Sequence, residues 1–202
     1  MKHYDLIIVG AGIAGASAAY EFSKQGGNVL LLEQYQFLHD KGSSHGGSRI
    51  FRYAYEDPSY VKLAIEAGLL WHELEHNLDE KLLFPTGGLD LASQDNIAIQ
   101  EIQAALKASQ QSYEILDAKE INKRFPAFKL EPEHIALYQK DAGVLAASRA
   151  LNSLLLAAAL NGADLHDNEA LNKIRQRRSR DKNKLGKLQC RENNLSHRLL
   201  VR

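Results

Sequence analysis

The amino-terminal stretch from Tyr4 to Glu33 constrains the fold of this chain more than any other segment. It opens with a buried-strand pattern, YDLIIVG, and passes through a glycine-rich turn into a helical pattern from Ile13 to about Gln25. A second apolar run, residues 28–32, ends on Glu33. Strand, glycine turn, helix and strand in this order make up the dinucleotide-binding fingerprint in its required context. We therefore expect an α/β fold with a Rossmann-like dinucleotide-binding domain.

Three glycines and one acid have separate roles in such a motif. Gly10 permits the tight turn, Gly12 lets a pyrophosphate approach the backbone, and Gly15 lets the helix pack close to the sheet. The amino end of the helix offers N–H groups and partial positive charge to phosphates. Glu33 stands where an acid accepts hydrogen bonds from ribose hydroxyls and disfavours a 2′-phosphate, so FAD or NAD fits better than NADP. The bland alternative is a glycine-rich turn in an ordinary α/β protein.

Downstream, apolar spacing predicts alternating helices and strands. We expect helices over 58–77, 94–110 and 148–161, and a short helix capped by Asp117 that stops before Pro126. We expect strands over 84–92, 113–116, 135–139, 163–166 and 170–174. Residues 34–48, rich in Gly, Ser and His, read as a polar loop.

The composition of the chain indicates the cellular compartment in which we expect it. Its single cysteine, Cys190, cannot form an internal disulfide. No uncharged apolar run is long enough to span a bilayer, and the first strand starts at Tyr4, which leaves no room for a signal peptide. We therefore expect a cytoplasmic enzyme-like protein without a membrane partner.

The last part of the chain differs in charge from the rest. Residues 175–202 hold 10 Lys and Arg against 2 Asp and Glu, whereas the whole chain holds 25 of each kind. We expect this basic tail to be disordered, and one explanation is a frameshift after about Ile174 in a once longer gene. The rival is an arm that binds RNA or anionic lipid. Interleaved aromatics are missing, which makes a nucleic-acid partner the weaker expectation.

The loop GSSHGGSRIFRYAYED, residues 42–57, is the most specific signal in the chain. Together with the glycine fingerprint it resembles the monomeric sarcosine oxidase, N-methyltryptophan oxidase and pipecolate oxidase family. These are FAD-dependent amine oxidases of the glycine/D-amino-acid oxidase superfamily. The resemblance runs in order through residues 4–174 and includes LWHELE at 70–75, TGGL at 86–89, EINKRFP at 120–126, DAGVL at 141–145 and NGA at 161–163.

The resemblance implies a two-domain flavin oxidase of which only the amino-terminal portion is present. The FAD-binding domain would comprise residues 1–83 and 147–174, discontinuous and incomplete. Residues 84–146 would begin an α+β substrate domain, and 175–202 would be the tail. The later half of the family fold, which supplies more sheet and most of the substrate wall, is absent.

Family members oxidise a secondary amine that bears a carboxylate, such as sarcosine, N-methyltryptophan or pipecolate. A hydride equivalent passes to the flavin, the imine hydrolyses, and molecular oxygen reoxidises the flavin to give hydrogen peroxide. The resemblance therefore implies FAD as cofactor and a small-molecule amine as substrate. The truncated chain is expected to be inactive alone, and a non-catalytic remnant or dinucleotide-binding fragment is the alternative.

Three residues of the loop match functional positions of that family, and two serines are expected to support them. Arg52 matches the arginine that binds the substrate carboxylate, for which a guanidinium is suited. Arg49 matches an arginine beside the flavin ring, where positive charge favours the anionic reduced flavin. His45 matches a histidine near the flavin, and Ser43 and Ser44 are expected to contact the cofactor or to order the loop. Solvated loop charges and a surface histidine are the alternative for the first three.

One departure leaves the substrate open. The sarcosine and N-methyltryptophan subgroups usually carry Asp-Thr before the first arginine, whereas this chain has Gly47 and Ser48. That pair is closer to the pipecolate-like pattern.

Residues 72–76, HELEH, match a zinc-hydrolase motif on an expected helix, with His72 and His76 as ligands and Glu73 as general base. No Gly-x-x-His extension follows, and the surrounding pattern fits a structural helix of the family. We therefore expect no metal site here and keep the zinc hydrolase as a distant alternative.

Overall fold

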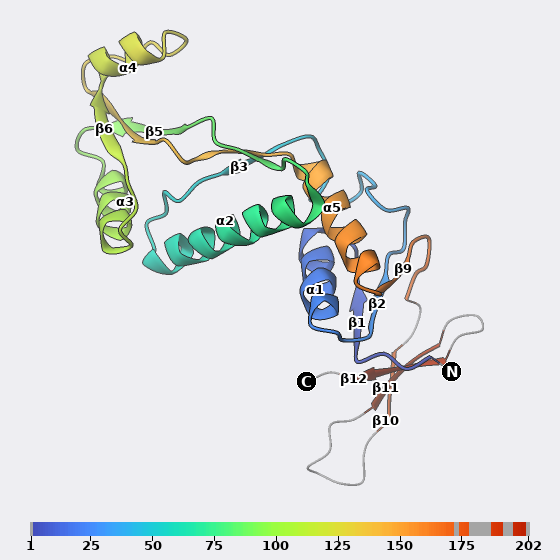
Figure 1. The fold of residues 1–202 in the computed structure, drawn as a ribbon. Helices are drawn as coiled ribbons and strands as arrows, with labels where there is room; N and C mark the ends of the chain where they lie inside the picture. The colour runs from blue at the N-terminus through green and yellow to red at the C-terminus, as the bar shows by residue number, and fades with distance from the viewer. Residues whose placement is uncertain (1, 172–173, 178–186, 192–195, 201–202) are drawn as a thin grey trace. The chain divides into compact units, whose positions relative to one another are not determined.

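The computed structural model describes residues 2–171, 174–177, 187–191 and 196–200 of the chain (Figure 1). The chain forms two compact units. The first comprises Met1–Gly47 and Ala147–Arg202, and the second comprises Ser48–Ala146. The chain therefore leaves the first unit once, builds the second unit as a continuous segment, and returns.

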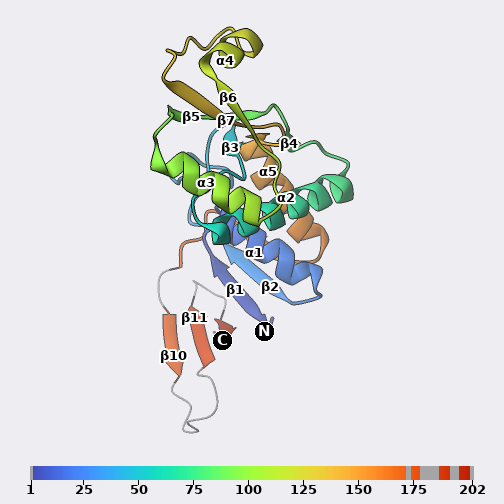
Figure 2. The same ribbon diagram turned by 90° about the vertical axis from the view of Figure 1, so that its left-hand side faces the viewer.

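A parallel sheet forms the centre of the first unit. Its strand order is β1–β2–β9, with β1 at Leu6–Val9, β2 at Val29–Leu32 and β9 at Asp164–His166. Figure 2 shows β1 and β2 side by side, and their register pairs Leu6 with Val29. All four residues of β2 are buried, as expected for the middle strand of a parallel sheet. The Rossmann-like start predicted from the sequence is confirmed.

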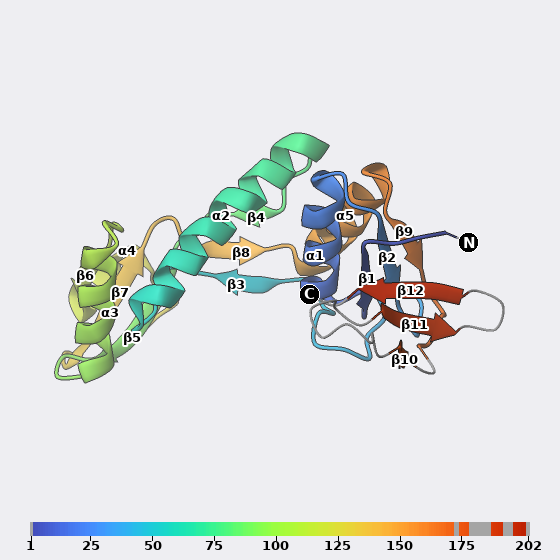
Figure 3. The ribbon, with the colours of Figure 1, turned by 90° about the horizontal axis from the view of Figure 1, so that it is seen from below.

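Two helices cover this sheet. Helix α1 spans Ile13–Lys24 and helix α5 spans Ala147–Leu160, and they lie side by side in Figure 3. Fully buried alanines dominate the contact surfaces, among them Ala16 and Ala19 of α1 and Ala150 and Ala158 of α5. Because alanine side chains are short, the two helix backbones can approach closely.

The turn from β1 into α1 needs two of the three glycines for steric reasons. Gly10 has a φ of +100°, a conformation that side-chain-bearing residues rarely adopt. A Cβ on Gly15 would lie 1.9 Å from the carbonyl oxygen of Gly10. The first turn of α1 therefore packs directly on the turn that precedes it, as the fingerprint predicted.

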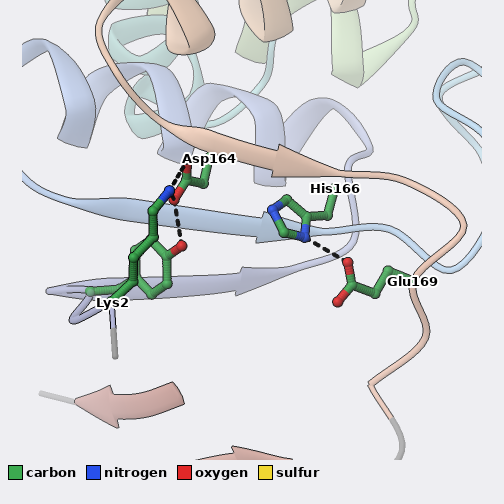
Figure 4. Close-up of polar contacts among 5 residues, drawn as sticks. Lys2, Asp164, His166 and Glu169 are labelled. Carbon is green, nitrogen blue, oxygen red and sulfur yellow. Dashed lines mark hydrogen bonds and ion pairs between the residues drawn. The ribbon is translucent and has the colours of Figure 1, made fainter. Parts of the chain in front are cut away.

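A group of polar side chains connects the start of the chain to β9 (Figure 4). Lys2 Nζ lies 2.8 Å from Oδ2 of Asp164, and the Tyr4 hydroxyl donates to the same oxygen. Hydrogen bonds from Lys2 and Tyr4 lower the pKa of Asp164, and burial raises the pKa of Tyr4. Two residues along β9, His166 Nδ1 lies 2.6 Å from Oε2 of Glu169. These polar contacts help to hold β9 at the edge of the sheet.

The described parts of the carboxyl-terminal segment form a second sheet. Strands β10 (Ile174–Arg177), β11 (Lys187–Arg191) and β12 (Ser196–Leu200) pair antiparallel in this order. We expected residues 175–202 to be disordered, and these strands differ from that expectation. The sequence KLQCR alternates polar and apolar residues with period two, which is a strand pattern that the high charge obscured. The strand expected at 170–174 begins only at Ile174.

Two small antiparallel sheets form the second unit. One has the order β3–β8–β4, with β3 at Arg49–Phe51, β8 at Gly143–Leu145 and β4 at Leu83–Phe84. The other has the order β5–β7–β6, with β5 at Gly88–Ser93, β7 at His134–Gln139 and β6 at Glu114–Asp117. The α+β character expected of the second part is therefore present.

Three helices complete the second unit: α2 at Pro58–Leu78, α3 at Ile97–Ala108 and α4 at Ala118–Arg124. Figure 2 shows α2 and α3 in this unit. Each begins at a side-chain cap, and Asp117 accepts the N–H of Glu120 as the sequence predicted. Val61 of α2 shares a buried apolar cluster with Ile99 and Ile102 of α3.

This packing explains a difference in boundaries. The sequence assigned residues 1–83 to the first domain, whereas residues 48–83 belong to the second compact unit. The cause is that residues of α2 share a buried apolar cluster with residues of α3. The assignment of FAD-binding and substrate-binding roles to the predicted domains stays a prediction.

Within the described residues, no helix combines the length and the apolar character that a membrane span requires.

Candidate functional site

Glu33 holds the end of β2 against the glycine turn. Its Oε2 accepts the N–H of Ala11 at 2.8 Å, and its Oε1 accepts the N–H of Tyr35 at 3.1 Å. His39 Nε2 lies 3.3 Å from Oε1, and the Glu33 side chain is only 7% exposed. The acid therefore sits beside the turn after β1, where the fingerprint predicts a ribose partner.

The electrostatic environment keeps Glu33 ionised. Burial by itself raises the pKa of this carboxyl, but the hydrogen bonds from Ala11 and Tyr35 and the neighbouring His39 outweigh burial and lower the pKa below its ordinary value. A carboxylate that stays charged is a strong acceptor for ribose hydroxyls.

The side chain of Ser44, from the loop 34–48, lies at the amino end of α1. Its hydroxyl accepts the N–H of Ile13 at 3.0 Å, and a Cβ on Gly12 would lie 3.1 Å from the same oxygen. Gly12 is the N-cap residue and no side chain of its own is available for capping. The loop hydroxyl thus satisfies an N–H group that could otherwise bind a phosphate oxygen.

Gly12, Glu33 and Ser44 all border one cavity of about 280 Å³. It lies within the first unit, and its lining contains Gly12, Glu33, Ser43 and Ser44 together with Ala11, Gln34, Tyr35, Leu38, His39, Lys41, Gly42 and Leu151. Four of the predicted cofactor-binding residues therefore converge on one cavity, and Gly10 and Gly15 form the turn beside it.

Among the lining residues that the sequence reasoning missed are Tyr35, His39 and Lys41, which form an aromatic and basic group. Lys41 Nζ lies 4.0 Å from the ring centroid of Tyr35, and the rings of Tyr35 and His39 meet edge to face with centroids 5.0 Å apart. Such a group presents aromatic surface and positive charge next to Glu33. The signal was the density of aromatic and basic residues in 34–41, which the loop assignment did not use.

Gly46 and Gly47 are anchored to the start of α5. The carbonyl of Gly47 accepts the N–H of Ala147 at 3.1 Å, and the carbonyl of Gly46 accepts both the N–H of Ser148 at 3.2 Å and its hydroxyl at 2.6 Å. His45, just before, is exposed, and its Nδ1 lies 2.5 Å from the carbonyl oxygen of Gly42. The histidine therefore belongs to an ordered turn.

Both candidate arginines lie in the second unit, on or next to β3. Arg49 is exposed, and its Nη1 donates to the carbonyl of Ser48 at 2.7 Å. Arg52 is half-buried and forms an ion pair with Asp90 of β5, and its guanidinium carbon lies 5.2 Å from the ring centroid of Tyr55. Asp90 was not singled out in the sequence, because an isolated acid in a strand carries no motif.

Arg52 and Asp90 face a cavity of about 600 Å³ within the second unit. The segments TGGL and DAGVL meet there, because the N–H of Gly87 donates to the carbonyl of Ala142 at 2.9 Å. A Cβ on Gly143 would lie 1.9 Å from the carbonyl oxygen of Phe84, so the two segments can approach only without a side chain at this position. Three separate sequence motifs thus converge on one cavity of a size usual for small ligands.

The predicted site residues therefore fall into two groups. Gly10, Gly12, Gly15, Glu33, Ser43, Ser44 and His45 belong to the first unit, and Arg49 and Arg52 belong to the second. The part that each would play toward a cofactor or substrate stays a prediction.

The HELEH segment has a structural explanation. His72 Nδ1 lies 2.8 Å from Oε2 of Glu75, and Oε1 of Glu75 accepts the N–H groups of Leu82 and Leu83 at 2.7 and 2.8 Å. Across residues 2–171 and the described strands that follow, no group of three or more His, Cys, Asp or Glu is arranged to hold a metal ion. The distant zinc alternative gains no support from this arrangement.

Comparison with protein families finds one model that matches most of the chain. Residues 5–194 match the model described as FAD dependent oxidoreductase. The match extends past Ile174, where we expected the resemblance to end. The alignments to individual relatives cover 83% and 85% of the chain, and the frameshift stays a hypothesis.

Relatives of known name agree with this match. The chain is 37% identical over 172 residues to the monomeric sarcosine oxidase of Streptomyces avermitilis and 36% identical over 171 residues to the peroxisomal sarcosine oxidase of Homo sapiens. The alignments cover 83% and 85% of this chain but only 44% of each relative. The chain thus spans less than half the length of the curated relatives it matches.

Among solved structures, the open form of a NikD mutant superposes with a TM-score of 0.82 at 25% identity. It is described as an unusual amino acid oxidase essential for nikkomycin biosynthesis. The superposition covers 98% of this chain and 50% of that one.

Proposed function

Because this chain belongs to the family of FAD-dependent oxidoreductases, we propose that it carries the nucleotide-binding part of an oxidase of secondary amino acids. The substrate is a small amine with a carboxylate, such as an N-methyl or cyclic amino acid. The amine loses two electrons and two protons to become an imine, which water hydrolyses. Molecular oxygen takes up the electrons and protons to give hydrogen peroxide.

The observation that carries the proposal is the cavity of the first unit, in which Gly12, Glu33 and Ser44 meet. The residues fit FAD: the backbone at Gly12 carries no side chain that would keep the pyrophosphate away, and Glu33 can accept hydrogen bonds from the ribose hydroxyls. Bound FAD supplies the two-electron acceptor that side chains lack. Ser44 Oγ already accepts the N–H of Ile13. When a phosphate oxygen binds there, this N–H would donate to the phosphate in place of Ser44 Oγ or to both acceptors.

In the second unit, Arg52 is proposed to bind the substrate carboxylate. Its guanidinium is oriented by Asp90 and by the Tyr55 ring and faces the cavity of about 600 Å³. Arg49 would supply positive charge toward the flavin ring, and His45 would exchange protons near it. These three roles rest on the resemblance of the loop 42–57 to the oxidase family.

The test begins with cofactor binding by the purified chain. We expect FAD added to the chain to show quenched fluorescence and a perturbed visible spectrum. Circular dichroism must first show that the chain is folded. A folded chain that leaves the FAD spectrum unchanged at high micromolar concentration would refute the nucleotide-binding proposal.

Turnover is tested separately, with sarcosine, N-methyltryptophan and pipecolate as substrates and peroxide as the readout. The second candidate function is dinucleotide binding without turnover, because the residues that fit FAD line a cavity of the first unit alone. FAD binding without peroxide on any of the three substrates supports this candidate, whereas peroxide formation supports the complete oxidase.

A further inference from the structure

We propose that Asp90 and Arg52 together form a subsite for zwitterions, in which Arg52 binds the carboxylate of an amino acid and Asp90 binds its protonated amine. The proposal rests on the carboxylate role of Arg52 given above. It adds a residue that determines specificity for the class of ligand, namely amino acids whose nitrogen is still cationic when they bind.

The contacts of the two side chains place opposite charges side by side in one cavity. Nη1 of Arg52 donates to Oδ1 of Asp90, and the two side chains are 40% and 23% exposed. Of the residues that line this cavity, Arg52 and Asp90 are the charged ones, and the others are apolar or neutral. A ligand in the cavity therefore meets one cation and one anion.

The ion pair of Arg52 and Asp90 lowers the affinity of the cavity for a ligand that carries only negative charge. A carboxylate that approaches Arg52 also approaches Asp90, and at similar distances the repulsion offsets much of the attraction. An α-amino acid carries its ammonium a few ångströms from its carboxylate, so it can present the opposite charge to each partner. Selection then results from repulsion of the wrong ligand as well as attraction of the right one.

The geometry leaves capacity for a second acceptor on Arg52. A guanidinium carries five N–H donors in a planar fork, and Asp90 is bound through Nη1. The Tyr55 ring, 5.2 Å from the guanidinium carbon, supports the group from its side. Gly87, Gly88 and Gly143 line the same cavity and leave its wall without side chains at those positions. A small ligand can therefore lie beside the ion pair.

The experiment compares two ligands that differ in one group. Sarcosine carries a protonated secondary amine, and methoxyacetate has the same chain length with an ether oxygen in its place. Both are titrated into the full-length chain at neutral pH and followed by NMR chemical-shift changes. We expect the unaltered chain to bind sarcosine about tenfold more tightly, because one charge interaction is gained. Equal affinity for the two ligands, or no binding of either to the folded chain, would overturn the subsite.

Variants then assign the preference to Asp90. D90N keeps the size of the side chain and removes its charge, so we expect the preference for sarcosine to fall to within about twofold, with D90E restoring part of it. D95N serves as the matched control, since Asp95 is an exposed acid of the same unit outside the cavity, and it should leave the preference unchanged.

Arg52 separates this inference from the proposed function. If R52A abolishes binding of both ligands while D90N leaves their ratio as in the unaltered chain, the role of Asp90 is refuted and the carboxylate site stands. If R52A leaves both affinities unchanged, the carboxylate role of Arg52 itself is refuted. Circular dichroism of each variant excludes unfolding as the cause, and the ligand preference of the unaltered chain is decisive even if D90N does not fold.

Discussion

Of the three glycines in the turn from β1 into α1, Gly15 has the least room for a side chain. Its missing Cβ is what lets the carbonyl of Gly10 lie against the first turn of α1, at a point where an added methyl group would be 1.9 Å from oxygen. The constraint is a backbone contact, so no side-chain rearrangement can relieve it. A substitution at Gly15 therefore tests whether folding, and with it the proposed cofactor binding, depends on this turn.

We predict that G15A destabilises the chain by about 3 kcal/mol, because overpacking against backbone forces α1 away from the sheet. Urea unfolding followed by circular dichroism measures the change. G47A is the control, since a Cβ at Gly47 meets nothing within 4 Å. A stability of G15A within about 0.5 kcal/mol of the unaltered chain would contradict the prediction.

Glu33 supports the second prediction at this scale. In E33Q one carboxylate oxygen becomes an NH₂ group, which cannot accept the N–H of Ala11 or Tyr35 and leaves it unsatisfied. We expect a loss of about 1–3 kcal/mol in stability and a weaker affinity for FAD. Chemical denaturation and FAD fluorescence titration measure the two effects, and unchanged values for both would show that the contacts of Glu33 are dispensable.

At the scale of elements, the long helices and the strands β6, β7 and β9 could be predicted, whereas two three-residue strands could not. Helix α2 begins at Pro58 as expected, because Asp57 caps it and the proline suits the first turn. Strands β3 and β8 were missed because each has three residues and depends on a partner more than 90 residues away in the chain. The ion pair of Arg52 was missed for the same reason, since Asp90 comes from another strand.

Glu75 joins two elements and makes stability depend on pH. It lies on α2 and accepts the N–H groups of Leu82 and Leu83 at the start of β4. Burial raises the pKa of this carboxyl, but the hydrogen bonds from Leu83, His72, Leu82 and Lys81 outweigh burial and lower the pKa from 4.5 to about 2. Because the folded pKa lies below the unfolded one, the stabilisation is fully present well above pH 4.5 and is lost as the pH falls toward 2.

We therefore predict that E75A lowers the free energy of unfolding by about 2–3 kcal/mol at pH 7 and that this difference shrinks steadily below pH 5. Urea unfolding at several pH values between 7 and 4 measures it. E66A is the control, because Glu66 is an exposed residue of the same helix. A difference between E75A and the unaltered chain that stays constant down to pH 4 would contradict the prediction if the titration of the other carboxyls is unaffected.

At the scale of the whole molecule, the family and the two-part organisation could be predicted from motifs, while the boundary at Gly47 and the pairing of β10 to β12 could not. Motifs report on local chemistry, and LWHELE matched the family pattern without indicating which core α2 joins. Its packing against α3 assigns residues 48–83 to the second unit. Similarly, the charge of residues 175–202 concealed a strand alternation that only pairing makes stable.

Ligand binding should stabilise the folded chain by an amount that grows with the logarithm of the ligand concentration divided by the dissociation constant. We predict that ADP at about 100 times its dissociation constant adds about 2.7 kcal/mol to the free energy of unfolding and that FAD at the same multiple of its own constant does likewise. NADP at the same concentration as ADP should add little, because Glu33 repels its 2′-phosphate. Thermal unfolding with each nucleotide measures this. Equal stabilisation by NADP and FAD would contradict the position assigned to Glu33.

The hydrogen bonds between residues 46–47 and 147–148 have a consequence for how this architecture can vary. The chain departs for the second unit and comes back at neighbouring points, so residues 48–146 form a self-contained insertion. Excising it and joining Gly47 to Ala147 would require no stretch of backbone. Exchange of residues 48–146 among homologues would then leave the parallel sheet of the first unit unbroken.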